Sequence, residues 1–394
     1  MTSTPLAGIR VIDLTQIYQG PYAAFLMAAA GADVIKVEPP AGERLRGRGG
    51  EFTPLSFVML NSNKRSVTLD LKSTEGKGLL KQLVADADVL LENFAPGVMD
   101  RLDLGWEVLH ALNPKLIYGS GTGYGLSGPD RDQLAMDHTI QAASGVMSST
   151  GNEGQPPARA GGAPSDLIGG VHLYAGVMSA LVGRASTGKG TRVEVSMLEA
   201  MFFTLCSEFA AYHARGEVPP RNSARSPSGA SPYGIYRCAD GWIAIICVAE
   251  SHWRGIARTI GRADVLETDE FDAAHKRKKR EAEIGDMIEA WSGNLSRDEA
   301  FARMRDAKVP VAPVKTLDEV YQDPHLLARG ALTPMLHPEL GALNLPSSPI
   351  RYSDYDSVPV AFFPDPGQHN VEIYGELPGI SNEILASYAE RGII

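Results

Sequence analysis

The sequence contains few cysteines, and none of them belongs to a recognisable pair. Only three occur in 394 residues, Cys206, Cys238 and Cys247, and no two of them form a Cys-x-x-Cys motif. A sparse and odd-numbered set is typical of proteins from a reducing compartment, so we expect free thiols and a cytoplasmic location. No spacing of histidine and cysteine matches a metal-binding motif, and we expect no metal site.

The chain also lacks an excess of positive charge and a long apolar run. It carries 37 lysines and arginines against 47 aspartates and glutamates, a formal net charge of −10. This balance disfavours a general nucleic-acid-binding protein. No stretch approaches the roughly 18 consecutive apolar residues of a membrane span, and the first residues lack the basic and apolar regions of a signal peptide. We therefore expect no membrane partner.

Two common nucleotide-binding motifs are missing as well. The sequence has no GxxxxGK[ST] P-loop, and in the glycine-rich run 119–125 Tyr124 stands where a GxGxxG motif needs its third glycine. A nicotinamide-binding site is therefore disfavoured, although the run follows a predicted strand. We expect no bound cofactor.

The sequence does contain a regular alternation of strand and helix patterns. Residues 9–14 and 33–38 are predicted strands around a helix that starts near Gly20-Pro21 and ends at Gly31. This βαβ unit predicts a parallel sheet. Further strands and helices are predicted at 74–86, 89–93, 98–102, 106–112, 115–118, 166–186, 191–195 and 197–214. We therefore expect an α/β domain with its sites at the carboxyl ends of the strands.

The character of the chain changes after residue 215. Residues 216–232 are rich in proline, serine, glycine and arginine, which is typical of a linker. A hairpin is predicted at 233–237 and 242–248 around Asp240-Gly241, and three helices follow it. Short strands return at 331–352, and a last helix is predicted at about 380–391. Residues 233–330 are thus expected to form a separate, smaller α+β unit.

One carboxylate has an unusual setting. Asp166 lies among four glycines in the run 159–170, directly before a predicted helix. Glycines let the backbone approach a ligand and leave N–H groups for developing negative charge, and a carboxylate so placed can act as a nucleophile. Alternatively, Asp166 is the N-cap of the helix that follows. Both interpretations stay open on this stretch alone.

Other polar residues gather near the predicted strand ends. Asp137 follows the glycine- and proline-rich loop 125–130 and precedes an apolar run, which makes it a candidate site group. Cations are scattered around Asn93-Phe94, namely Lys64, Arg65, Lys72 and Arg101. Together they fit a site for phosphates and a flat base, since arginine binds phosphate as a fork.

Several stretches, in this order and spacing, resemble the family III CoA-transferases (CaiB/BaiF). This group includes formyl-CoA:oxalate and carnitine CoA-transferases, with the α-methylacyl-CoA racemases as relatives. The resemblance covers nearly the whole chain. It is carried by the residues 20–21, 31–38, 63–66, 69–72, 88–97, 113–114, 123–125, 137–141, Gly145, Asp166, 187–193, 309–313 and 323–325.

The resemblance implies a specific architecture. It implies a Rossmann-like large domain made from both ends of the chain, 1–215 and 331–394, and a small α+β domain at 233–330 after the linker 216–232. It also implies a homodimer whose subunits interlock. Selection of the acids is expected in the linker and the small domain.

The resemblance also implies roles for individual residues. Asp166 falls on the catalytic aspartate, and Tyr18 and Gln19 fall beside the thioester. The glutamine stands one position later than is usual in the family. The remaining implied substrate contacts are Leu69, Lys72, Asn93, Phe94, Ala95, Arg101 and Asp137. An arginine that some members carry after the second strand is Pro39 here, and Arg46 or Arg44 is its candidate substitute.

The predicted activity is the transfer of CoA from an acyl-CoA to a small carboxylic acid. Asp166 would form an acyl anhydride and then an aspartyl-CoA thioester, with glycine amides stabilising the oxyanions. Two alternatives stay open. A racemase needs an acid/base pair, but Met136 occupies the position where the racemases carry a histidine, and His138 follows on the other side. A non-catalytic acyl-CoA-binding protein would not need Asp166.

Overall fold

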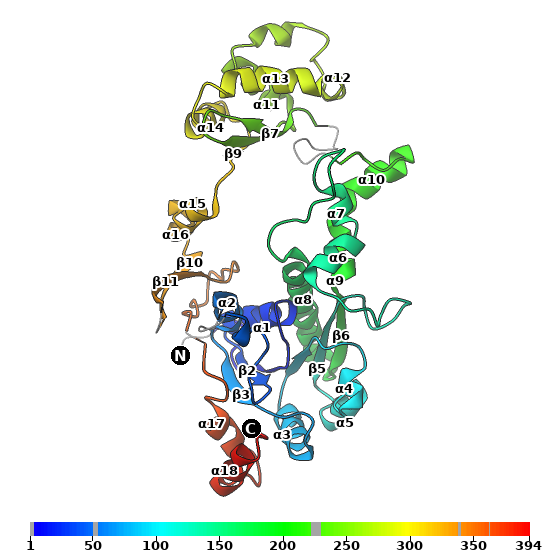
Figure 1. Ribbon diagram of the computed structural model, residues 1–394, viewed down its shortest axis with the longest axis vertical. Helices are drawn as coiled ribbons and strands as arrows, with labels where there is room; N and C mark the ends of the chain where they lie inside the picture. Colours follow the sequence, from blue (N-terminus) through cyan, green and yellow to red (C-terminus); the bar gives the residue numbers. More distant parts are fainter. Residues whose placement is uncertain (1–3, 50–53, 222–229, 338–339, 362) are drawn as a thin grey trace. The chain divides into compact units, whose positions relative to one another are not determined.

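The structure, a computed structural model, describes residues 4–49, 54–221, 230–337, 340–361 and 363–394 (Figure 1). Its contacts divide the chain into two compact units. The first comprises Met1–Ser144, Ala160–Thr204 and Asp323–Ile394, and the second Gly145–Arg159 and Leu205–Gln322. The second unit therefore begins earlier than the expected small domain and also takes in residues 145–159. Part of the predicted linker, 222–229, lies outside the described residues.

The first unit is built on a six-stranded parallel sheet. In spatial order its strands are β3 (Arg65–Thr68), β2 (Asp33–Glu38), β1 (Arg10–Asp13), β4 (Val89–Glu92), β5 (Ile117–Thr122) and β6 (Thr191–Ser196). Ile12 of β1 is in register with Ile35 of β2 and Leu90 of β4. This is the strand order of a doubly wound sheet, whose direction of winding reverses between β1 and β4. The prediction of an α/β fold is confirmed.

Helices cover both faces of this sheet, and strands β1, β2 and β4 are buried along nearly their whole length. Helices α1 (Gln19–Ala29) and α8 (Pro164–Thr187) lie side by side on one face (Figure 1), where they bury Val11, Val34 and Val89. The other face is covered by α3 (Thr74–Ala85), α5 (Trp106–Leu112), α17 (Asn370–Gly375) and α18 (Asn382–Glu390). The loops at the strand ends are left to form sites.

The remaining elements of the first unit are short. They are α2 (Leu55–Asn61), α4 (Val98–Arg101), α6 (Asp137–Ala143), α9 (Met197–Phe202), α16 (Pro324–Ala328) and the hairpin of β10 (Leu332–His337) with β11 (Gly341–Pro346). The single helix predicted at 197–214 is wrong. A 3-10 turn at Phe203–Leu205 interrupts it, and the boundary between the two units falls in this turn.

The second unit is α+β, as its sequence pattern predicted. Strands β7 (Tyr233–Arg237), β8 (Trp242–Ile246) and β9 (Val311–Pro313) form an antiparallel sheet, with the hairpin turn at Asp240-Gly241. Its helices are α7 (Val146–Ser149), α10 (Cys206–Arg215), α11 (Glu250–Thr259), α12 (Ala274–Lys279), α13 (Glu281–Ser292), α14 (Arg297–Asp306) and α15 (Leu317–Tyr321). Ser296 and Thr316 are the N-caps of α14 and α15.

The glycine-rich run is part of a strand, and the predicted end of this strand at residue 118 is wrong. β5 continues to Thr122, because Gly119 and Gly121 leave room for close neighbours. A Cβ atom on Gly119 would lie 2.7 Å from Leu91 Cδ2, and one on Gly121 would lie 2.8 Å from Gln19 Oε1. The two glycines therefore serve close packing.

Helix α8 is the one described helix that is long and apolar enough, by length and composition alone, to cross a membrane. It contacts α1, β5 and β6, and it carries the buried Asp166 in its first turn. We therefore describe it as a packing helix of the first unit. The three cysteines are free thiols, as expected. The cytoplasmic location stays a prediction.

Candidate active site

The loops at the carboxyl ends of β1, β4 and β5 meet where the winding of the sheet reverses. Two pockets, of about 200 Å³ and 360 Å³, open at this edge and share Gln16 and Phe94 as lining residues. Doubly wound sheets bind their ligands in such a crevice, since the loops diverge there. All lining residues of both pockets belong to the first unit.

Asp166 lines the smaller pocket from the first turn of α8. The helix begins at Pro164 after Ala163 as N-cap, so the interpretation of Asp166 as the N-cap is wrong. The residue is only 8% exposed, and the backbone N–H of Gln19 lies close enough to its carboxyl group to lower the pKa. Burial, reinforced by the charge of Asp137, raises the pKa of Asp166 to about 7. A carboxylate perturbed in this way inside a pocket is a strong candidate for chemistry.

Asp137 supports the start of α8 from the first turn of α6. Its carboxylate accepts the N–H of Ser165 at 2.9 Å and Nε2 of Gln141 at 2.7 Å. Gln141 is buried and accepts the N–H of Ala160 at 2.9 Å. Asp137 and His138 begin α6, and His138 is exposed. Asp137 thus fixes the segment that leads to the pocket carboxylate.

Gln19 and Tyr18 lie in different surroundings. Gln19 is buried and lines the smaller pocket, where Gly121 and Gly169 leave space for its side chain. Its Nε2 is buried without a hydrogen-bond partner among the described residues. Tyr18 packs instead against the apolar cluster that includes Leu45 and Phe57. Of the two residues, Gln19 is therefore the one placed beside the pocket carboxylate.

The glycines around Asp166 were expected to offer free N–H groups to developing negative charge, but the structure gives them other surroundings. Gly169 and Gly170 lie inside α8, where N–H groups take part in helical hydrogen bonds. Their missing side chains let α1 approach, since a Cβ on Gly170 would lie 2.5 Å from the carbonyl oxygen of Gln19. Gly161 and Gly162 are exposed residues before the helix. Gln19 is thus a better placed donor than the two helical glycines.

The larger pocket brings together several predicted CoA positions. Leu69, Lys72 and Phe94 line it, and Ala95 lines the smaller pocket beside it. Asn93 lines the smaller pocket as well and ties two loops together. Its amide accepts the N–H of Gln16 and donates to the carbonyl of the same residue, each at 2.8 Å.

The two predicted arginines differ in whether the guanidinium group is free to contact a substrate. Arg101 is exposed at the end of α4, near Gly97. Arg46 forks onto Glu38 at 2.6 and 2.7 Å, donates to the carbonyl of Pro364, and lies over the ring of Phe57. Because its guanidinium is occupied in this way, we do not retain Arg46 among the substrate contacts.

Most of one wall of the smaller pocket was missed in the sequence, where only Met136 had been considered, as the position of the racemase histidine. Residues Arg131, Gln133 and Met136 line it from the segment between β5 and α6, and Met197 lines it from α9. The glycine- and proline-rich loop 125–130 was the available signal, because pocket walls are often built from such loops. Nothing in the local pattern indicated which side chains after the loop face the pocket.

The model of CoA-transferase family III matches residues 6–370 of the chain. The chain belongs to this family. Formyl-CoA:oxalate CoA-transferase from Streptomyces coelicolor is 35% identical, with all of both chains covered. Succinyl-CoA–D-citramalate CoA-transferase from Chloroflexus aurantiacus is 33% identical, over 99% of this chain and 98% of that protein.

Solved structures agree with this family membership. The crystal structure of a CAIB/BAIF family protein from Brucella suis is 32% identical and has a TM-score of 0.84, covering 95% of this chain and all of that one. Rv3272 from Mycobacterium tuberculosis has a TM-score of 0.85 at 27% identity, with 95% of this chain and all of that one covered. The resemblance seen in the sequence is confirmed.

Proposed function

We propose that this enzyme moves CoA from an acyl-CoA to a free carboxylic acid, with Asp166 as the nucleophile. The observation that carries the proposal is a buried carboxylate with a raised pKa in a pocket at the switch point of the sheet. Because the raised pKa lies near neutral pH, the ionised form is both available and more basic than an ordinary aspartate. The names of the relatives support the same reaction class.

In the proposed reaction, Asp166 binds first the acyl group and then CoA, in four steps. The carboxylate attacks the donor thioester, the C–S bond breaks, and an acyl–aspartyl anhydride and a CoA thiolate result. The thiolate attacks the aspartyl carbonyl and releases the donor acid, which leaves an aspartyl-CoA thioester. The acceptor carboxylate then attacks this thioester, and the thiolate released attacks the acceptor carbonyl of the new anhydride. The product acyl-CoA leaves, and the free aspartate returns.

Gln19 is placed to stabilise the oxyanions of these steps. Its backbone N–H already meets the carboxylate of Asp166, and its Nε2 has no partner among the described residues. A donor aimed at developing negative charge contributes roughly 3–4 kcal/mol to the transition state. Gln19 would therefore stabilise the oxyanions, a role that the sequence analysis had given to the glycine amides.

Gly121→Ala is expected to lower kcat by tenfold or more, with little change in KM for the acyl-CoA. The added methyl group would lie 2.8 Å from Oε1 of Gln19, so this side chain must move away from its place. A displacement of about 1 Å at a reacting centre costs on the order of 10²-fold. Steady-state kinetics measure the effect.

Gly183→Ala is the matched control for this variant. Gly183 lies in α8 with no atom within 4 Å of the added Cβ, so activity should stay within twofold of wild type. A Gly121→Ala enzyme with normal kcat would contradict the proposed role of Gln19.

The larger pocket is the proposed site of the CoA nucleotide. Lys72→Ala and Arg101→Ala should each raise KM for the acyl-CoA about tenfold or more and leave KM for the acceptor acid nearly unchanged. Loss of a contact to a charged phosphate costs about 1.5–3 kcal/mol. Lys189→Ala, which removes an exposed lysine next to Gly188 and Gly190, is the control. Equal effects on both substrates would count against a nucleotide site here.

Chemical trapping tests the covalent intermediate directly. After incubation with an acyl-CoA donor, hydroxylamine should convert Asp166 to a hydroxamate that is visible in the mass of its peptide. The named relatives act on formyl-CoA with oxalate and on succinyl-CoA with D-citramalate, so these pairs are the first substrates to try. Modification of a different carboxylate, with Asp166 unchanged, would overturn the assignment.

We infer that the enzyme is a homodimer. The first unit exposes several large apolar side chains on α8 and just after α9, among them Val171, Val182 and Phe203. Large apolar side chains that stay exposed in a single chain are candidates for an interface with a second copy. Light scattering should give a mass twice that of the 42.2 kDa chain, and a single-chain mass at micromolar concentration would contradict the inference. Interlocking of the subunits stays a prediction.

A further inference from the structure

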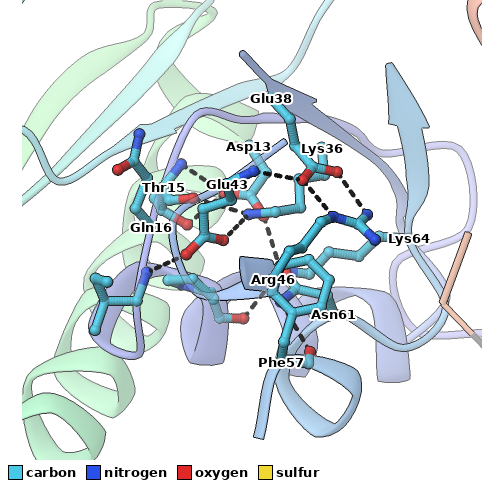
Figure 2. Close-up of polar contacts among 12 residues, drawn as sticks. Asp13, Thr15, Gln16, Lys36, Glu38, Glu43, Arg46, Phe57, Asn61 and Lys64 are labelled. Atoms are coloured by element: carbon cyan, nitrogen blue, oxygen red, sulfur yellow. Dashed lines mark hydrogen bonds and ion pairs between the residues drawn. The ribbon is translucent and has the colours of Figure 1, made fainter. Parts of the chain in front are cut away.

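A cluster of charged side chains is buried beneath the loop that leads from β1 to α1 (Figure 2). We call it the charge cluster, and its members are Asp13, Lys36, Glu38, Glu43, Arg46 and Lys64. Three ion pairs connect them: Lys64–Asp13 at 2.8 Å, Lys36–Glu43 at 3.0 Å and Arg46–Glu38 at 2.6 Å. With three charges of each sign, the charge cluster is neutral as a whole.

Burying so many charges is costly for a protein. Ion pairing offsets only part of the free energy lost by desolvation. Apolar side chains of similar volume are often at least as stabilising as a buried ion pair. The cost is visible at Lys64, where burial lowers the pKa to about 8 although Asp13 lies next to it. Stability alone therefore does not account for the charge cluster, and its contacts with the backbone need an explanation.

The charge cluster holds the backbone of the β1–α1 loop. Asp13 accepts the N–H of Thr15 at 2.9 Å, and Lys36 donates to the carbonyl oxygen of Thr15 at 2.9 Å. Glu43 accepts the N–H of Ile17 at 2.8 Å. Figure 2 shows Lys36 and Glu43 meeting beside this loop.

Asn93 from the β4 loop binds both backbone polar groups of Gln16, the residue between Thr15 and Ile17. Side chains thus bind five successive backbone groups of this loop, namely the N–H and C=O of Thr15, the N–H and C=O of Gln16 and the N–H of Ile17.

This loop has a strained conformation. Ile17 has a φ of 69°, in the left-handed region that a β-branched residue strongly disfavours. Such strain persists only where the surrounding structure imposes it, and it is most frequent at functional sites. The hydrogen bond from the strained residue to Glu43 identifies the group that imposes it. Helix α1 begins two residues later, with Gln19.

We propose that Glu43, held by Lys36 within the charge cluster, is a positioning residue that delivers Gln19 to Asp166. The inference rests on the proposed function, in which Asp166 is the nucleophile. It extends that function, because neither Glu43 nor Lys36 lines the smaller pocket. Both act through the loop backbone.

The proposal predicts a change at Asp166 that a merely structural role would not produce. Among the charged groups around Asp166, Asp137 from α6 raises its pKa, and Arg131 lines the same pocket. From α1 the carboxylate receives the N–H of Gln19, which lowers the pKa. When the loop is released, this N–H moves away and the pKa of Asp166 must rise.

Glu43→Gln tests the proposal by titration of the full-length protein. With aspartate labelled by 13C at the carboxyl group, and with Asp166→Asn to identify the signal, wild-type Asp166 should titrate near pH 7. In Glu43→Gln the midpoint should lie about one unit higher, the usual effect of losing one hydrogen bond to a charged group. Because the ionised form of Asp166 reacts, kcat/KM falls at low pH, and the pH midpoint of this fall should rise by the same amount. KM for the acyl-CoA should stay within twofold of wild type.

Further variants keep the test decisive. Glu43→Asp retains the charge but withdraws the carboxylate from Ile17, and it should shift the titration in the same direction even if Glu43→Gln does not fold. Glu250→Gln is the matched control, because Glu250 pairs with the buried Arg277 in the second unit. It should leave the titration of Asp166 unchanged.

The outcomes separate this proposal from the proposed function. An unchanged midpoint in a folded Glu43→Gln or Glu43→Asp protein would overturn the positioning role. A shifted midpoint in a protein that shows no CoA transfer even as wild type would support the positioning role and refute the proposed function. As a further check, Ile17→Gly should return part of the shift in Glu43→Gln, because glycine adopts the φ of Ile17 without strain.

Discussion

Asp166→Ala should lower turnover by roughly four orders of magnitude or more. In the proposed reaction this carboxylate carries first the acyl group and then CoA, and no step proceeds without it. Loss of a covalent nucleophile in other enzymes costs on the order of 10⁴- to 10⁶-fold. The measurement is steady-state CoA transfer, together with the hydroxylamine trap, which should label no peptide in the variant.

The loss should not come from unfolding. Asp166 has a raised pKa in the folded protein, so the folded state disfavours its charged form. By linkage, this group destabilises the fold increasingly as pH rises from about 4 to about 7, and fully above that range. Asp166→Asn should therefore be more stable than wild type at pH 8 and show little gain at pH 4. Thermal unfolding at the two pH values measures this difference.

The two results together identify a functional residue. A carboxylate kept at the expense of stability is expected where chemistry needs it. If Asp166→Asn were destabilised at pH 8, the residue would be supporting the structure, and the assignment as nucleophile would lose its main physical argument. If activity fell less than tenfold, another group would have to carry the acyl chain.

The sheet could be predicted from the sequence because its signals are local. The strand predicted at 33–38 is β2 residue for residue, since the β-branched residues Val34, Ile35 and Val37 indicate a strand without reference to its neighbours in the sheet. The helix after Gly20-Pro21 and the hairpin around Asp240-Gly241 follow from proline and glycine placement in the same way. The position of the site follows from the strand order, which the βαβ pattern restricts.

The surroundings of the site could not be predicted, because they depend on contacts distant in sequence. Lys64 was grouped with surface cations near the strand ends, but its partner Asp13 lies 51 residues earlier, and both are buried. Arg46 was expected to meet the substrate and instead meets Glu38. No local pattern distinguishes a buried lysine from an exposed one when its counter-charge comes from another strand.

Gln19 shows the same limit at the scale of one residue. Alignment by Gly20-Pro21 placed Tyr18 at the usual glutamine position. Helix α1 begins two residues after Ile17, so the directions of the Tyr18 and Gln19 side chains depend on the left-handed turn at Ile17. An isoleucine gives no signal for this turn, because a positive φ is normally indicated by glycine or asparagine. The turn is explained only by Glu43, which lies on a separate loop.

No deuterium should enter the α-position of a 2-methylacyl-CoA that is incubated with this enzyme in D2O. Racemisation needs a base on each side of the α-carbon. Met136 lines the smaller pocket where the racemases carry a histidine, and a thioether exchanges no proton near neutral pH. His138 is exposed and does not line this pocket, and both carboxylate oxygens of Asp137 already accept hydrogen bonds.

Mass spectrometry of the recovered acyl-CoA measures the exchange, with heat-inactivated enzyme as the background. When an acceptor acid is supplied, the same preparation should show ping-pong kinetics, because the acyl group passes through Asp166 before the acceptor reacts. Wash-in at a rate comparable to turnover, with no acceptor present, would favour the racemase alternative over transfer. In that case Asp166→Ala should abolish the wash-in as well, and the missing second base would have to be sought among the residues around Met136.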